Sequence, residues 1–329
     1  MKQLKRKNGK LSVKLLALLF TISALQVSAK TPYEFSVYAG GGYACFLYRL
    51  SNAEVPIPAP ASTRPIPEPY HYSLQQAVSG VSSSGSAGEL GVGFTGFVTS
   101  QIGLHVGLGI SLHNIGVNVD SLKTFTENNT DLINNETRNL FSALYGYRET
   151  YRTFSLSVPL MIQFQTMQNQ GGWNRRNDVK QGFYAMAGVK LNILLSNTYE
   201  SQVSSFYASA HYVDKNNWTD TQNFAGFGTF KGKNSKGDFG YIQALLAVEA
   251  GMKWRISDNM YLYTGAYLDY GLNDPTKNSR KPTSDFIHPD NLPELTLLEF
   301  ADRTNLFVIG VKLRLAFIKY FDQLSCPQF

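Results

Sequence analysis

The sequence is poor in residues that form covalent or metal cross-links. It has two cysteines in 329 residues, too few for a disulfide framework, and its five histidines show no His-x-x-x-His spacing. Cys-x-x-Cys is absent too, so neither a metal site nor a cofactor is expected. Beyond the N-terminal segment, no apolar run reaches the roughly 18 residues that suit a transmembrane helix.

An excess of charge of one sign is also missing once the N-terminus is set aside. Residues 1–29 have the features of a secretory signal peptide: a basic start, an apolar core from Leu15 to Leu25, and small residues ending at Ala29. The chain has 30 basic and 24 acidic residues, and six basic but no acidic residues lie in this signal. The remaining chain has 24 of each sign. Nucleic acid is therefore not expected as a partner.

Alternating apolar residues are what the sequence has in abundance. From Ile102 to Leu112 every second residue is apolar, and each residue between is Gly, His or Ser. This period of two predicts an extended strand with one apolar face and one small or polar face. The pattern recurs about eight times, at residues 33–47, 88–99, 102–112, 153–165, 183–196, 242–256, 262–272 and 307–317.

The links between these strands alternate in length. Shorter links follow the second, fourth and sixth strands, and the other four links have roughly 30 to 40 residues. Such lengths are unusual inside a compact soluble domain, whereas transmembrane barrels have short periplasmic turns and long outer loops. We therefore expect four long extracellular loops. The aromatic residues of the third loop are expected either as short strand extensions or as a partner-contact surface: Phe206, Tyr207, Tyr212, Trp218 and Phe230.

The size of the apolar face decides which side of the barrel is inside. An eight-stranded barrel has an interior just wide enough for side chains to fill, and about fifty mostly large residues on the apolar face would overpack it. The apolar face therefore points to lipid, and closure pairs every backbone group in a medium without water. The predicted fold is all-β: an eight-stranded antiparallel up-and-down transmembrane barrel over residues 30–318, followed by a periplasmic tail, 319–329. A full hairpin in the third loop would give ten strands instead.

The chain resembles small outer-membrane barrels of Gram-negative bacteria, on its signal segment and on two stretches, Tyr38 to Gly42 and Phe154 to Met161. It resembles the transmembrane domain of OmpA, the barrel OmpX and, more closely, the PorT-like "outer membrane protein beta-barrel" group. The resemblance implies Sec-type export, an outer-membrane location, contact with outer-membrane lipid, and insertion by the barrel-assembly machinery.

The resemblance also implies an assembly signal in the last strand. The matching residues are Gly310, Leu313, Leu315 and Phe317. The polar residue usual two places before the glycine is Val308 here, which is a departure from the family pattern. Because the chain continues to Phe329, either Phe317 or Phe329 can be the recognised aromatic residue.

Charged residues recur on the small, lumen-facing side of the strands. A buried charge needs a partner, so these residues are expected to form a ladder of ion pairs that fills the tube; the alternative is a gate that opens when pairs exchange partners. No wide pore is expected in either case. The residues are Glu89, Lys190, Glu249, Lys253, Arg255, Asp269, Lys312 and Arg314.

The function expected from these features is structural, or surface binding of an extracellular protein or glycan through the outer loops. The PorT-like resemblance implies an alternative, a transport or secretion component. An enzyme is the least favoured class, because it would need a histidine to meet a serine and an acid at the outer rim. The candidate histidines lie in three different loops: His71, His211 and His288.

Overall fold

The computed structural model describes eleven stretches of the chain, and all are extended or in turns. They are residues 32–50, 55–56, 73–74, 78–130, 137–166, 181–212, 217–219, 228–231, 234–238, 242–274 and 301–320. The signal segment 1–29, His71, His288 and Phe329 lie outside the described residues. Among the residues described, no helix is long and apolar enough to cross a membrane.

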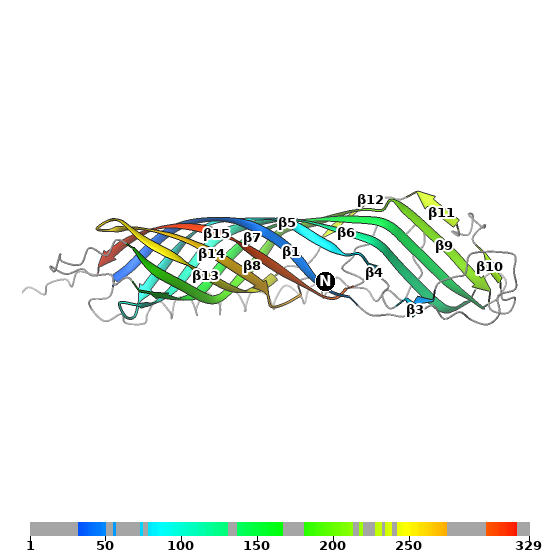
Figure 1. Ribbon diagram of the computed structural model, residues 1–329, viewed down its shortest axis with the longest axis horizontal. Coiled ribbons are helices and arrows are strands. Elements are labelled where there is room, and N and C mark those ends of the chain that lie inside the picture. Colours follow the sequence, from blue (N-terminus) through cyan, green and yellow to red (C-terminus); the bar gives the residue numbers. More distant parts are fainter. Residues whose placement is uncertain are drawn as a thin grey trace, which may run out of the picture.

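Eight long strands form the body of the molecule (Figure 1). They are β1 (Pro32–Leu50), β5 (Ser82–Phe97), β6 (Ile102–Thr130), β7 (Thr137–Gln165), β8 (Gln181–Gln202), β13 (Ile242–Ser257), β14 (Met260–Gly271) and β15 (Ala301–Tyr320). Each pairs antiparallel with the next in this order, and β15 returns to pair with β1. The sheet is therefore a closed eight-stranded up-and-down barrel, and the ten-stranded alternative is wrong.

The seam between the first and last strands is paired along the whole length of β1. It runs from Pro32 opposite Tyr320 to Leu50 opposite Ala301, with one register shift at its outer end. Strand β15 thus continues two residues past the predicted barrel end at residue 318. Closure leaves no unpaired strand edge in the ring.

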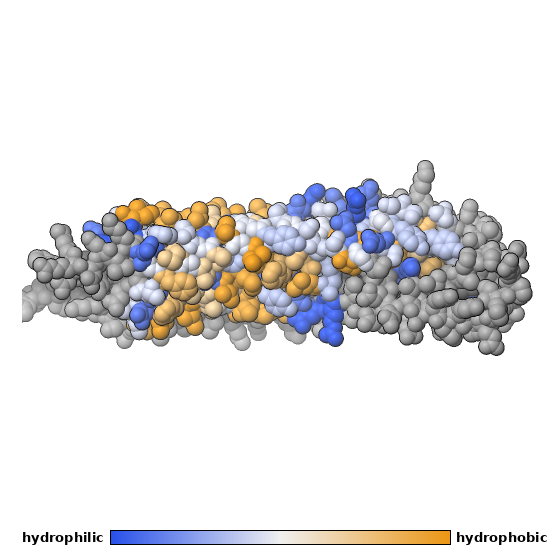
Figure 2. Space-filling model, viewed as in Figure 1, coloured by the Kyte–Doolittle hydropathy of each residue, from blue (hydrophilic) through white to orange (hydrophobic). Residues whose placement is uncertain are grey.

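The outer wall of the barrel carries the apolar face, as expected. Large apolar side chains are exposed on seven of the eight ring strands, all except β14; Val311 is 69% exposed, Ile162 62% and Leu313 55%. Figure 2 shows this apolar surface as a belt over the barrel, followed by a hydrophilic band further along the molecule. A belt of this kind is stable only against lipid acyl chains. The chain is an eight-stranded transmembrane barrel.

Two of the expected outer loops contain further strands, and a third is formed by continuations of ring strands. Short strands β2 (Val55–Pro56), β3 (Ser73–Leu74) and β4 (Val78–Ser79) lie in the first loop. The third contains β9 (Ser205–Tyr212), β10 (Asn217–Thr219), β11 (Gly228–Lys231) and β12 (Asn234–Asp238). The expected second loop is largely the hairpin of β6 and β7, which pair as far as Thr130 and Thr137. This outer segment is therefore built mostly of strand, because β6 and β7 stay paired beyond the apolar belt.

These added strands form an extension of the barrel wall beyond the membrane (Figure 1). Strand β9 pairs with the outer part of β7, β10 and β11 pair with β9, and β12 pairs with β8. We call this part, made of the outer ends of β6, β7 and β8 with β4 and β9 to β12, the extracellular extension. The third-loop aromatics lie in its strands, which confirms their reading as strand extensions.

The apolar face changes sides where the strands leave the membrane. In β6, Ile110 and Leu112 face lipid, whereas Val117 and Val119, at odd positions, are buried inside. The buried residues of the outer end form one apolar core with Tyr147 and Tyr151 from β7, and with further residues from β1, β8, β9, β13, β14 and β15. Above the membrane the outer surface meets water, so the apolar residues pack inward.

Candidate functional site: the charged barrel interior

Ion pairs fill the membrane-spanning interior in an upper and a lower cluster. In the upper cluster the Lys190 ammonium lies 2.5 Å from the Asp269 carboxylate and 2.9 Å from that of Glu89. Lys312 pairs with Glu89 too, and its Nζ is 3.2 Å from Glu249. Each carboxylate in this cluster therefore contacts at least one ammonium group.

Arginine and aromatic groups close the upper cluster from below. The Arg314 guanidinium lies 3.4 Å from Glu249, whose carboxylate also accepts a hydrogen bond from the Tyr184 hydroxyl at 2.8 Å. The Arg314 carbon is 4.4 Å from the centre of the Tyr263 ring. The cation is held by a carboxylate and by an aromatic face together.

The lower cluster is centred on Glu34, which was not among the predicted lumen charges. Lys253 donates to Glu34 at 2.7 Å and to Gln165 at 2.9 Å, and the Tyr263 hydroxyl donates to Glu34 at 2.6 Å. Gln163 links the clusters, because it accepts from Arg314 at 3.3 Å and donates to the Tyr263 hydroxyl at 3.3 Å. Glu34 lies on the small, lumen-facing side of the first predicted strand, and this position is the sequence feature that could have identified it as a lumen charge.

The two clusters together, which we call the lumen network, balance their charges. Four acids and four bases take part: Glu34, Glu89, Glu249, Asp269, Lys190, Lys253, Lys312 and Arg314. Their side chains are at most 8% exposed. Buried ions are tolerated when each has a partner and hydrogen bonds. The structure brings together seven of the eight predicted residues in this way.

Arg255 is the predicted residue that lies outside the lumen network. Its side chain is 37% exposed and donates at 2.6 Å to Asp258 in the turn between β13 and β14. Arg255 lies two residues before β13 ends at Ser257, so the same face of the strand meets solvent there. The prediction of a lumen position for Arg255 is therefore wrong.

Lumen-facing glycines make room for the large side chains. Gly40 lies opposite both Glu89 and Lys312 on its two neighbouring strands, so these side chains meet across it. A Cβ atom on Gly91 would lie 2.5 Å from the Tyr38 hydroxyl, and one on Gly93 would lie 2.4 Å from the His105 ring. The abundance of glycine on this face follows from the narrow interior.

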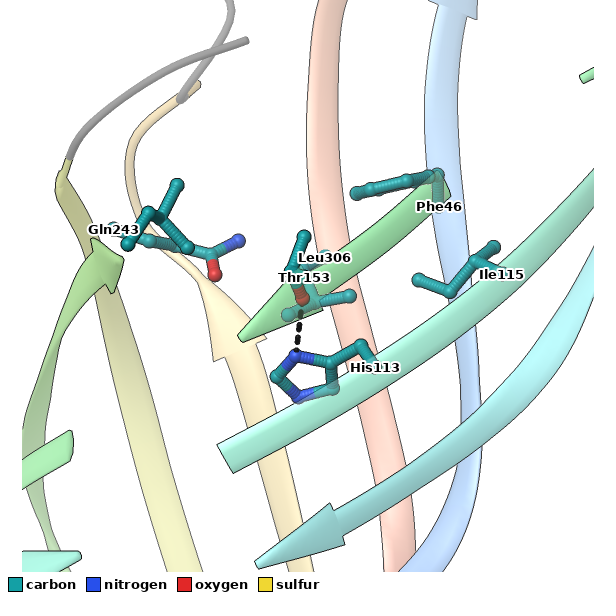
Figure 3. A pocket seen from close by; sticks show the side chains of 7 residues that line it. Phe46, His113, Ile115, Thr153, Gln243 and Leu306 are labelled. Atoms are coloured by element: carbon teal, nitrogen blue, oxygen red, sulfur yellow. Dashed lines mark hydrogen bonds between the residues drawn. The ribbon is translucent and has the colours of Figure 1, made fainter. Parts of the chain in front are cut away.

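The two lumen histidines each form a hydrogen bond with a threonine. His105 bonds the Thr95 hydroxyl at 2.9 Å, and His113 bonds Thr153 at 3.0 Å. Figure 3 shows the His113 ring near Phe46, Ile115 and Leu306. These side chains line a void of about 10 Å³. Within the described part of the chain, no three His, Cys, Asp or Glu residues are grouped as a metal site requires.

The assembly-signal residues lie on the last strand as predicted. Leu313 and Phe317 project from β15 into the apolar belt, and Leu315 is half-buried between them. Gly310 lies opposite Gly42 across the seam. Their recognition by the assembly machinery stays a prediction.

Several solved outer-membrane and surface proteins are similar in fold. Pseudomonas aeruginosa OprG matches with a TM-score of 0.28 and 11% identity, covering 87% of this chain and 96% of that one. Ail of Yersinia pestis, in complex with the heparin analogue sucrose octasulfate, gives 0.23 and 9% over 87% and 99%. Neisserial surface protein A gives 0.26 and 8% over 85% and 95%. No protein-family model matches the sequence, and no curated protein matches it.

Similarity at these values says nothing about activity. The closed ring, the apolar belt and the charged interior of this chain are the architecture of an integral outer-membrane β-barrel.

Proposed function

We propose that this protein is a non-conducting outer-membrane barrel that presents the extracellular extension as a binding surface for a protein or glycan. The observation that supports this most is the continuous strand pairing from the membrane into the extension: β6 and β7 pair over almost their whole 29-residue lengths. A surface held by the wall of the barrel is fixed in orientation. Rigid presentation of this kind lowers the entropy lost on binding.

The filled interior supports binding over transport. The lumen network occupies the membrane-spanning part, and the apolar core that includes Phe46, Leu245 and Leu306 closes the space above it. An ion crossing the barrel would have to break several buried pairs and then pass an apolar layer. The transport or secretion alternative therefore requires a large rearrangement of the interior.

Catalysis is not part of the proposal. His211 lies in β9 of the extracellular extension, while His71 and His288 lie outside the described residues. The lumen histidines are each hydrogen-bonded to a threonine within the barrel wall. A binding role needs none of these groups as an acid or base.

The test removes the outer strands and keeps the ring. Replacing residues 205–231 with a short Gly-Ser linker deletes β9, β10 and β11 but leaves all eight ring strands. Cells that display equal amounts of heat-modifiable wild-type or deleted barrel are compared for binding to immobilised glycans and extracellular proteins. We expect a ligand bound by the wild type to be lost on deletion. Equal binding by both, or a reproducible unit conductance of the wild type in planar bilayers, would contradict the proposal.

A further inference from the structure

A cleft of about 450 Å³ lies on the barrel wall across four adjacent strands, β5 to β8. Part of its lining is a row of residues that lie opposite one another at the end of the apolar belt: Gly88, Leu112, Phe154 and Ser196. An added Cβ atom on Gly88 would meet nothing within 4 Å. The wall therefore has a notch here, where the neighbouring Leu112 is 53% exposed.

A polar row follows two residues further along the same strands. Ser86 lies opposite Asn114, and Asn114 lies opposite Arg152, and all three also line the cleft. Their side chains point outward, as do those of the row below. Two residues along a strand correspond to about 7 Å. The cleft thus spans the step from apolar to polar residues on the outer wall of these strands.

A register shift between β7 and β8 lies beside the cleft. Phe154 lies opposite Ser196 but Ser155 lies opposite Leu194, so one residue of β8 is left without a partner. As a result Leu195 and Ser196 are both exposed, although adjacent residues of a strand normally face opposite sides. The apolar side chain of Leu195 and the hydroxyl of Ser196 are therefore both exposed on the outer wall, next to each other along β8.

Arg152 gives the cleft its charge. Its side chain is 63% exposed, and the nearest acid, Glu200, is 3.9 Å away and 47% exposed. An exposed pair at this distance is weak, so the planar guanidinium keeps N–H donors for an anionic group such as a phosphate. The charge stands directly above the apolar notch, where lipid headgroups meet acyl chains.

We propose that this cleft binds one phosphorylated glycolipid of the outer leaflet, of the lipid A type. An acyl chain lies over Gly88 between Leu112 and Phe154, the phosphate contacts Arg152, and the sugar hydroxyls face Ser86, Asn114 and Ser196. The belt below is already a lipid surface, and the cleft is continuous with it. The proposal is independent of what the extracellular extension binds.

The test measures lipid A retained by the purified full-length barrel in detergent, by native mass spectrometry. Wild type is expected to hold one molecule. Arg152→Gln should weaken binding about tenfold, which corresponds to about 1.4 kcal/mol, because a charge-assisted hydrogen bond to the phosphate is lost. Gly88→Leu should weaken it similarly by filling the notch. Glu200→Gln should strengthen binding, because it removes the competing carboxylate.

Matched controls separate this site from general lipid contact. Arg255→Gln removes an exposed arginine at the other end of the barrel and should leave binding unchanged. Every variant is first shown to be folded by its heat-dependent gel shift. Equal binding by Arg152→Gln and wild type, equal binding of dephosphorylated lipid A, or equal binding of phosphatidylglycerol would overturn the proposal.

Discussion

At the scale of residues, each charged side chain of the lumen network lies inside the barrel beside a partner of opposite charge. Lys253 and Arg255 are both basic and lie two positions apart on β13. Lys253 is fully buried with Glu34 and Gln165, whereas Arg255 reaches solvent at the turn. A charge that is taken out of water depends on its partner, and a solvated charge does not.

Lys253→Met should therefore destabilise the barrel by about 3–5 kcal/mol, because it leaves Glu34 as a buried charge without its ammonium partner. Arg255→Met is the matched control and should cost less than about 1 kcal/mol. The free energy of unfolding is measured by urea titration of the heat-modifiable fraction in lipid vesicles. Equal losses in the free energy of unfolding for the two variants would show that the buried Lys253–Glu34 pair does not stabilise the barrel more than the exposed Arg255 side chain does.

The glycines of β5 offer a second contrast between neighbours on one strand. Gly93→Ala should cost about 1–3 kcal/mol, because its Cβ atom would lie 2.4 Å from the His105 ring. Gly88→Ala should change stability by less than about 0.5 kcal/mol, since it faces open space. The same urea titration measures both. The Gly93 penalty should shrink in a His105→Ala background, and a penalty that stays constant would exclude the ring as its cause.

At the scale of elements, β6 and β7 each serve two environments. The membrane-spanning part of β6 is apolar at even positions from Leu104 to Leu112, and the extracellular part is apolar at odd positions from Ile115 to Val119. The strand itself is unbroken. The switch in parity is a sequence signal for the membrane boundary, and it explains why this strand was expected to end near residue 112.

Val119→Asp should unfold the extracellular extension and leave the membrane ring intact, because it places an unpaired carboxylate in the apolar core. Asn118→Asp is the control on the exposed face of the same strand. The readout is cleavage by a protease added to intact cells, together with the heat-dependent gel shift. We expect rapid cleavage of Val119→Asp only. Loss of the gel shift in that variant would show that the ring and the extension fold as one unit.

At the scale of the whole molecule, closure joins strands that are far apart in the chain. Glu34 in the first strand contacts Lys253 and Tyr263, more than 200 residues away. The seam between β1 and β15 completes the ring only after the last strand is made. The barrel and its interior network are therefore expected to form together.

The intact protein should fractionate with the outer membrane and migrate differently on a gel before and after boiling, because a closed barrel resists detergent at room temperature. Breaking the seam with Gly42→Val should abolish the shift, since a Cβ atom at Gly42 would lie 2.2 Å from the Ile309 carbonyl oxygen. Gly41→Val is the control, with its nearest contact at 3.7 Å. Recovery of the protein from the periplasm as a soluble monomer would contradict the transmembrane assignment.

The sequence by itself determined that the chain forms a closed eight-stranded barrel. It also determined that the apolar face of each strand points to lipid and the small, polar face points to the interior. Alternation with a period of two fixes which residues share a face of the sheet. The apolar side chains are too bulky to fit inside an eight-stranded barrel, so they must face outward. Seven lumen charges followed from the same alternation, because strand parity depends only on local geometry. Arg255 was misplaced since parity does not reveal how far along the barrel a residue lies.

Only the tertiary structure decided which charges pair and how far the strands continue. The contacts of Glu34 with Lys253, and of Lys190 with both Glu89 and Asp269, join residues on different strands, at heights set by the tilt and stagger of the closed ring. The extracellular extension depends in the same way on β9 meeting β7 across more than 50 residues of chain. The local sequence pattern specifies which face of a strand a residue is on, whereas closure of the barrel specifies which residues of other strands it contacts.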